Sequence, residues 1–290
     1  MNVNANLPST TSLSLLASVF VLGAFPSGAA TAKPPDVETI ELTGIVRDFL
    51  PSHPDFDVVP NEGWGHYMWN IAPVLGVDGK LIYEGGGNKV DTQCLDSTGR
   101  PICWTLYDPD PDVGDTPAVP GNPDNGGIQG AWTFATWFRD IPGINLSMAY
   151  TVTATLRTSG IYAGMYECNI PQFYPIDGLL FGNDFTGYNN FFTFEIVTDF
   201  TYDASANQEF LIKGDDDVWV FLNGQLVADL GGMNGSPEQW IDLDRLGLVD
   251  GETYPIHMFS ANRNGDVKLH LVTSFVMGNS APVTISAVFD

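Results

Sequence analysis

Residues 218–230 read VWVFLNGQLVADL, two apolar runs separated by Asn223 and Gly224. A two-residue type I′ turn needs positive φ at both central positions, which Asn and Gly tolerate. The stretch therefore predicts a β-hairpin. Trp219 and Phe221 alternate with apolar residues, so both faces of this hairpin are apolar, and we expect the two aromatic side chains to lie in the core.

The rest of the chain also reads as strands and turns. Residues 151–157 (TVTATLR) and 190–202 (NFFTFEIVTDFTY) alternate with period two and are rich in Thr, Val, Ile and Phe. The chain has 31 Gly and 20 Pro, a content typical of many turns. We therefore predict an all-β fold in one domain over residues 37–290, with a Pro- and Asp-rich surface loop or linker at 108–127.

The N-terminal segment has the layout of a secretory signal peptide. Residues 13–25, LSLLASVFVLGAF, are apolar but too short to span a bilayer comfortably, and Ala30 and Ala32 follow as an A-x-A pattern before Lys33. Residues 1–12 carry no Lys or Arg, so a disordered tail or a wrongly chosen start codon is the alternative. We expect residues 1–32 to be a signal peptide, the chain to be secreted to the extracellular space, and no later transmembrane segment.

The charge balance excludes one large class of function. The chain has 35 Asp and Glu against 11 Lys and Arg, a net charge of −24. A general nucleic-acid binder needs a basic surface to neutralise phosphates, so we expect no nucleic-acid partner. The hydrophobic content of 44% also excludes a wholly disordered acidic chain.

The three cysteines allow one short-range bridge. Cys94 and Cys103 flank a short polar loop, and a disulfide is chemically allowed after export. We predict a Cys94–Cys103 disulfide, with Cys168 left over. The chain has no C-x-x-C pair and its four His are scattered, so a zinc site is not expected.

Three consecutive carboxylates, Asp215, Asp216 and Asp217, stand directly before the predicted hairpin. Like charges ~4 Å apart repel by about 4 kcal/mol near a protein surface, so something should offset them. A hard divalent cation such as Ca²⁺ would do so, because it prefers carboxylate and carbonyl oxygens. The alternative is a solvated turn that uses Asp for its turn propensity.

Several segments, in order, resemble one known family. GDDDVWVFLNGQLVADLGG at 214–232 looks like the signature of the fibro-slime domain, a branch of the PA14-like superfamily. The other segments that resemble the family are LTGIVRDFLPSHPDF at 42–56, FRDIPGINLSM at 138–148, FYPIDGLLFGND at 173–184, NNFFTFEIVTDFTY at 189–202 and LGLVDGETYPIHMFSANR at 246–263.

The resemblance implies a PA14-like β-sandwich or barrel with a calcium site. In sugar-binding members two consecutive Asp at the start of this hairpin coordinate Ca²⁺, and the ion also contacts sugar hydroxyls. By position these are Asp215 and Asp216, with Asp217 in the place of a small residue that shapes the turn. Asn234 is a further candidate ligand. The chain has Met233–Asn234 where the family usually has Val-His, which affects the expected ligand more than the expected fold.

We therefore expect a calcium-dependent carbohydrate-binding or adhesion module of the cell surface or extracellular matrix. Its partner would be an extracellular glycan or matrix polysaccharide. The alternative is a structural matrix or slime component that self-associates and has no defined small ligand. No catalytic motif is present, so we do not expect an enzyme. Exposed sugar stacking is expected, if anywhere, from Trp64, Tyr67 or Trp69, for which core packing is the alternative reading.

Overall fold

The predicted hairpin is formed by strands β11 (Asp217–Leu222) and β12 (Gln225–Leu230) in the computed structural model, which describes residues 37–265 and 267–278. Asn223 and Gly224 have φ of 50° and 77°, the positive values that a type I′ turn requires. Trp219 and Phe221 are completely buried. The expectation that both aromatic side chains belong to the core is therefore confirmed.

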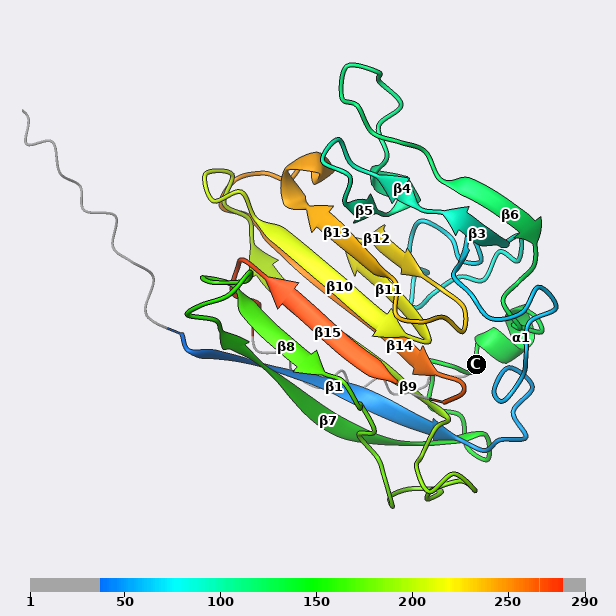
Figure 1. Ribbon diagram of the computed structural model, residues 1–290. Helices are drawn as coiled ribbons and strands as arrows, with labels where there is room; N and C mark the ends of the chain where they lie inside the picture. Colours follow the sequence, from blue (N-terminus) through cyan, green and yellow to red (C-terminus); the bar gives the residue numbers. More distant parts are fainter. Residues whose placement is uncertain (1–36, 266, 279–290) are drawn as a thin grey trace, which may run out of the picture. The chain divides into compact units, whose positions relative to one another are not determined.

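The hairpin forms one end of a ten-stranded sheet, counted over the described residues (Figure 1). The strand order is β12-β11-β14-β9-β1-β7-β8-β15-β10-β13. Its other members are β1 (Thr39–Phe49), β7 (Asn145–Leu156), β8 (Tyr166–Ile170), β9 (Phe192–Thr201), β10 (Glu209–Asp215), β13 (Glu238–Asp242), β14 (Thr253–Asn262) and β15 (Lys268–Thr273). All of its paired strands are antiparallel.

Smaller elements lie in the connections. One small sheet pairs β2, β3 and β6, and a second pairs β4 with β5. These strands and the short helices are β2 (Tyr67–Met68), β3 (Asn88–Thr92), β4 (Cys94–Leu95), β5 (Pro101–Ile102), β6 (Val119–Pro123), α1 (Ala131–Phe134) and the 3₁₀ turns Trp104–Leu106 and Leu243–Leu246. The predicted all-β class is thus confirmed.

The large sheet curls until its two outermost strands, β12 and β13, lie side by side. Gln239 of β13 closes this seam with its side chain. Its Oε1 accepts from the main-chain N–H of Asp229 at 2.8 Å, and its Nε2 donates to the main-chain oxygen of Asp229 at 3.4 Å. A side-chain amide therefore takes the place of ladder hydrogen bonds at Asp229, whose main-chain groups would otherwise lie unpaired at the edge of β12.

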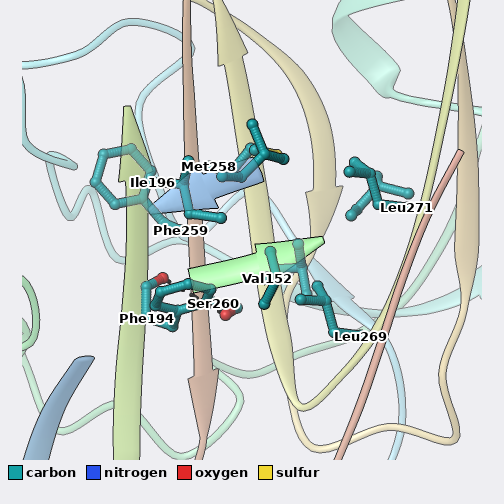
Figure 2. A pocket seen from close by; sticks show the side chains of 11 residues that line it. Val152, Phe194, Ile196, Met258, Phe259, Ser260, Leu269 and Leu271 are labelled. Atoms are coloured by element: carbon teal, nitrogen blue, oxygen red, sulfur yellow. Dashed lines mark hydrogen bonds between the residues drawn. The ribbon is translucent and has the colours of Figure 1, made fainter. Parts of the chain in front are cut away.

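The inner face of the curled sheet is a packed apolar core. Phe194 and Ile196 of β9, Met258 of β14 and Leu269 of β15 surround a gap of about 20 Å³ (Figure 2). That volume is close to the minimum for a single water, and its lining is almost entirely apolar. The interior is a core with a small packing defect and is too small to bind a sugar.

The outer face of the hairpin is also buried, under an aromatic layer. Trp137 lies 6.2 Å from Trp219 between ring centroids, and Phe134 of α1 lies 5.7 Å from Trp219 in an edge-on arrangement. Phe138 covers Phe259 of β14 at 4.9 Å. Because both faces of β11 are buried, its sequence is continuously apolar and does not alternate with polar residues.

The predicted disulfide is absent from the structure. Cys94, Cys103 and Cys168 are buried free thiols. The β4–β5 register pairs Cys94 with Ile102, so Cys103 is one residue beyond its partner. Cys103 lies just beyond β5, directly before the 3₁₀ turn Trp104–Leu106, and so is outside the paired ladder. Loop length alone could not reveal this register.

The Pro- and Asp-rich segment at 108–127 is more ordered than a linker. It contains β6, which pairs with β3, and Asp115 in it forms an ion pair with Arg245 at 2.6 Å. The described residues, 37–265 and 267–278, fall within one compact unit. The expected signal peptide at 1–32 and the end of the predicted domain lie outside the described residues. Within the described ranges, no helix has the length and apolar character needed to cross a bilayer.

Candidate functional site

The three consecutive aspartates form the link between β10 and β11, across the seam of the curled sheet. Asp215 is the last residue of β10, Asp217 the first of β11, and the peptide bond between Asp215 and Asp216 is cis. The solvated turn that the residues alone allowed is not what the structure shows. The exposed fractions of Asp215, Asp216 and Asp217 are only 7%, 1% and 1%.

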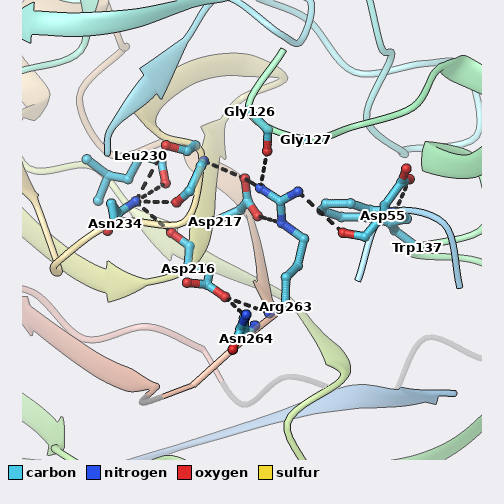
Figure 3. A network of polar contacts seen from close by, with 12 residues as sticks. Asp55, Gly126, Gly127, Trp137, Asp216, Asp217, Leu230, Asn234, Arg263 and Asn264 are labelled. Atoms are coloured by element: carbon cyan, nitrogen blue, oxygen red, sulfur yellow. Dashed lines mark hydrogen bonds and ion pairs between the residues drawn. The ribbon is translucent and has the colours of Figure 1, made fainter. Parts of the chain in front are cut away.

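Asp216 is held by backbone donors at the end of β14. Its Oδ2 accepts from the N–H groups of Arg263 at 2.6 Å and Asn264 at 2.9 Å (Figure 3). Burial raises the pKa of Asp216 well above its ordinary value; the charges of Asp217 and Asp215 add to this, while Arg263 opposes it. Both backbone donors bind Oδ2 of this carboxylate.

Asp217 is neutralised by a buried arginine. Its Oδ2 lies 2.6 Å from Nε of Arg263, and both side chains are essentially inaccessible to solvent. Its Oδ1 accepts from the N–H of Gly232 at 2.6 Å. Asp217 therefore has a structural ion-pair role, whereas the sequence predicted that it would stand in for a small residue in the turn.

Arg263 connects this ion pair to two distant loops. Its Nη2 donates to the carbonyl oxygen of Gly126 at 2.9 Å, and its Nη1 donates to that of Asp55 at 3.4 Å. The guanidinium carbon also lies 5.2 Å from the ring centroid of Trp137 (Figure 3). A cation over an indole face is favourable, and more so when desolvated. Arg263 thus fixes the loops around the acidic link.

Asn234 lies beside the acidic link, and its amide binds backbone groups. Its Nδ2 donates to the carbonyl oxygens of Asp216 at 2.8 Å and Gly232 at 2.6 Å, while its Oδ1 accepts from the N–H of Ser236. Ser236 in turn donates from its hydroxyl to Oδ2 of Asp215 at 2.9 Å. Asn234 therefore orders the loop next to Asp215 and Asp216, and its role as a metal ligand stays a prediction.

Asn262 is a residue that the sequence reasoning missed. It ends β14, and the neighbouring register pairs Asp217 with Ala261, which brings Asn262 next to Asp216. Both side-chain polar atoms of Asn262 are buried without a hydrogen-bond partner in the described part of the chain. Buried polar groups are nearly always satisfied by protein, water or an ion. The unsatisfied amide of Asn262 therefore indicates that an additional group binds beside it.

The site is acidic, but its side chains do not form a complete set of metal ligands by themselves. Asp217 is paired with the buried guanidinium of Arg263, and Oδ2 of Asp215 accepts from the hydroxyl of Ser236. Among residues 37–265 and 267–278, no three His, Cys, Asp or Glu side chains are arranged to hold a metal by themselves. An ion bound here would therefore also need amide, main-chain carbonyl or water oxygens, which are ordinary Ca²⁺ ligands.

The comparisons with known proteins agree with this fold. Residues 177–287, which include the acidic link and the hairpin, match the PA14 domain family. The Dictyostelium discoideum protein psiD is 28% identical over 90% of this chain and 45% of its own length. Protein psiQ of the same organism is 38% identical over 46% of this chain and 14% of its own length. The chain thus spans less than half the length of these curated relatives.

A solved PA14 sugar-binding domain from an RTX adhesin is also similar to this chain. Its sequence identity is 16%, its TM-score is 0.24, and the alignment covers 29% of this chain and 46% of that chain. The match to the PA14 domain family confirms the PA14-like resemblance that the sequence motifs indicated. Residues 177–287 therefore belong to a PA14 domain, and over most of its length the chain is similar to the psi proteins.

Proposed function

We propose that the chain is a secreted, calcium-dependent carbohydrate-binding or adhesion module of the cell surface or extracellular matrix. The observation that carries this proposal is the burial of three consecutive carboxylates, Asp215, Asp216 and Asp217, at the link between β10 and β11. The match to the PA14 domain family covers this segment and supports the assignment. Its action is binding without catalysis.

The residues present fit a hard divalent cation. Asp215 and Asp216 would supply the carboxylate oxygens, and the unpartnered amide of Asn262 adds a candidate oxygen. Asn234 orders the adjoining loop, and its Oδ1 could contribute in addition to accepting from Ser236. A bound Ca²⁺ would supply positive charge and open positions for sugar hydroxyls, while the chain orients the carboxylates and limits access of water.

Calcium binding should depend on pH with a definite sign. Burial raises the pKa of Asp216, so without the cation its carboxyl tends to hold a proton. Ca²⁺ needs the deprotonated form, and proton and metal therefore compete. The affinity for Ca²⁺ should weaken as the pH falls toward this raised pKa.

Chelation tests the proposal on the whole chain. Extracellular calcium modules have Kd values of ~10⁻⁴–10⁻³ M. Binding to the folded state alone stabilises it by about 2.7 kcal/mol at 100 times Kd. We expect EDTA to lower the melting temperature and to abolish binding to a glycan array. Asp216→Asn should lose both responses, whereas Asp112→Asn, a change at an exposed aspartate of the 108–127 segment, should keep them.

The outcomes separate the two candidate functions. If calcium changes neither melting temperature nor glycan binding, the proposed site is wrong. If the chain binds no glycan and self-associates in sedimentation velocity, the structural matrix role is favoured instead. Glycan binding that survives EDTA while the melting temperature falls would make the metal purely structural.

A further inference from the structure

One exposed tryptophan stands out in the segment between β1 and β2. Of the three aromatic residues considered for stacking, Tyr67 is 0% exposed and Trp69 is partly buried. The main-chain N–H of Trp69 donates to Oδ2 of Asp229 at 3.0 Å. Trp64 is 53% exposed. The structure therefore leaves one of the three free to meet a ligand.

The backbone around Trp64 is held in place although the side chain is not covered. Every residue from Glu62 to Gly65 except Trp64 itself has a backbone hydrogen bond that fixes the loop. These bonds run from Glu62 N to Asp124 Oδ2, from Lys89 Nζ to Glu62 O, from Gly63 N to Pro60 O, from the Tyr67 hydroxyl to Gly63 O, and from Gly65 N to Met233 O.

The two glycines that flank Trp64 are required by this backbone. Gly63 has a φ of 76°, which L side chains rarely adopt. Gly65 also has a positive φ, of 158°, and a Cβ there would displace the end of the Lys89 side chain. Trp64 is therefore displayed from a loop with fixed geometry, and little conformational entropy is lost when a partner binds to its ring.

The loop is bonded directly to the loop of the candidate calcium site. Gly65 donates its N–H to the carbonyl oxygen of Met233 at 2.8 Å, and the next residue, Asn234, donates to the carbonyl oxygen of Asp216. Tyr67 donates in the same way to Gly231 at 2.7 Å. Trp64 thus flanks the loop that borders Asp215 and Asp216.

We propose that Trp64 is the stacking surface for a pyranose ring of the glycan that binds at Asp215 and Asp216. This inference rests on the proposed function. Indole is a large, rigid, apolar surface with a polar N–H, and such side chains provide contact area at low entropic cost. The C–H face of a pyranose matches it, while the hydroxyls are directed to the polar groups of the site. A single exposed apolar residue is unremarkable by itself; its rigid support next to the acidic link assigns the role.

The test uses a matched pair of exposed tryptophans in the whole chain with saturating calcium. Methyl glycosides of glucose, galactose, mannose and N-acetylglucosamine are the probes, with affinity from calorimetry and the bound face from saturation-transfer NMR. Trp64→Ala should weaken binding about tenfold or more, as expected for an aromatic hot spot. Trp64→Phe should keep part of the affinity. Trp132→Ala, at the 71% exposed tryptophan of α1, should bind like the wild type.

A second readout distinguishes this inference from the proposed function. The calcium-induced rise in melting temperature should be the same in Trp64→Ala and the wild type. If Trp64→Ala binds glycosides as tightly as the wild type, the stacking role is wrong while the calcium site stands. If the wild type binds none of the glycosides in calcium, the carbohydrate-binding function fails and the stacking role fails with it.

Discussion

Replacing Arg263 with methionine should destabilise the chain severely, because it leaves Asp217 buried without its partner. The ion pair spans 2.6 Å between two inaccessible side chains. Removing one partner of such a pair costs about 3–5 kcal/mol. The carbonyl oxygen of Gly126 also loses its donor, which adds about 1 kcal/mol. We therefore expect Arg263→Met to lower the free energy of unfolding by about 4–6 kcal/mol.

The double variant Asp217→Leu/Arg263→Met should recover much of that loss. Replacing both partners by apolar groups removes the buried unpaired charge, which carries most of the penalty. In a double-mutant cycle measured by urea unfolding, the coupling between the two positions should be about 2 kcal/mol or more. Arg263→Lys keeps the charge without the planar fork and provides a folded comparison where Arg263→Met is too unstable.

The pH dependence gives an independent check of the same reasoning. In Arg263→Met the unpaired Asp217 carboxyl can be neutralised by a proton, so the destabilisation should be smaller at pH 4 than at pH 7. The view that Asp217 is held by this ion pair would be refuted by two results together. The effects of Asp217→Leu and Arg263→Met on the free energy of unfolding would be additive, and the destabilisation by Arg263→Met would be the same at pH 4 and pH 7.

Two further predictions concern the curled sheet itself. Burial raises the pKa of Asp229 from 3.8 to about 6, so the folded state binds its proton more tightly than the unfolded state does. The free energy of unfolding should therefore fall as the pH rises between those values. Asp229→Asn should remove about 3 kcal/mol of this pH dependence, measured by urea unfolding at pH 4 and pH 7. Val152→Ile adds a methylene beside the gap of about 20 Å³ and should raise the free energy of unfolding by about 0.5 kcal/mol. Val46→Ile, at a buried residue away from the gap, should lower it. Thermal melts that show equal effects of the two substitutions would contradict the packing argument.

Local signals predicted the hairpin because its turn chemistry is local. Asn223 and Gly224 adopt positive φ on their own account, and the apolar runs on either side need only each other to form two strands. The burial of both faces of β11 also followed from the absence of alternation in its sequence. These features depend on residues that are neighbours in sequence.

The register of distant or irregular segments could not be predicted in this way. Cys94 and Cys103 are close in sequence, yet the β4–β5 pairing sets Cys94 opposite Ile102 and leaves Cys103 just beyond the ladder. Gln239 closes the barrel only because β13 arrives next to β12, and nothing within Glu238–Asp242 indicates which strand it will meet. Long-range pairing determines both outcomes.

The acidic link shows the same division within one site. The pattern of three aspartates identified the location, but it could not assign different roles to adjacent and chemically identical residues. Those roles come from β14, which ends beside the link and contributes Asn262, the Arg263 side chain and two backbone N–H groups. Arg263 pairs with Asp217, backbone donors bind one oxygen of Asp216, and the Ser236 hydroxyl binds one oxygen of Asp215. The loop that carries Asn234 is bonded to the carbonyl oxygen of Asp216 and to Gly65, so the roles of the three aspartates depend on segments that lie far apart in the sequence.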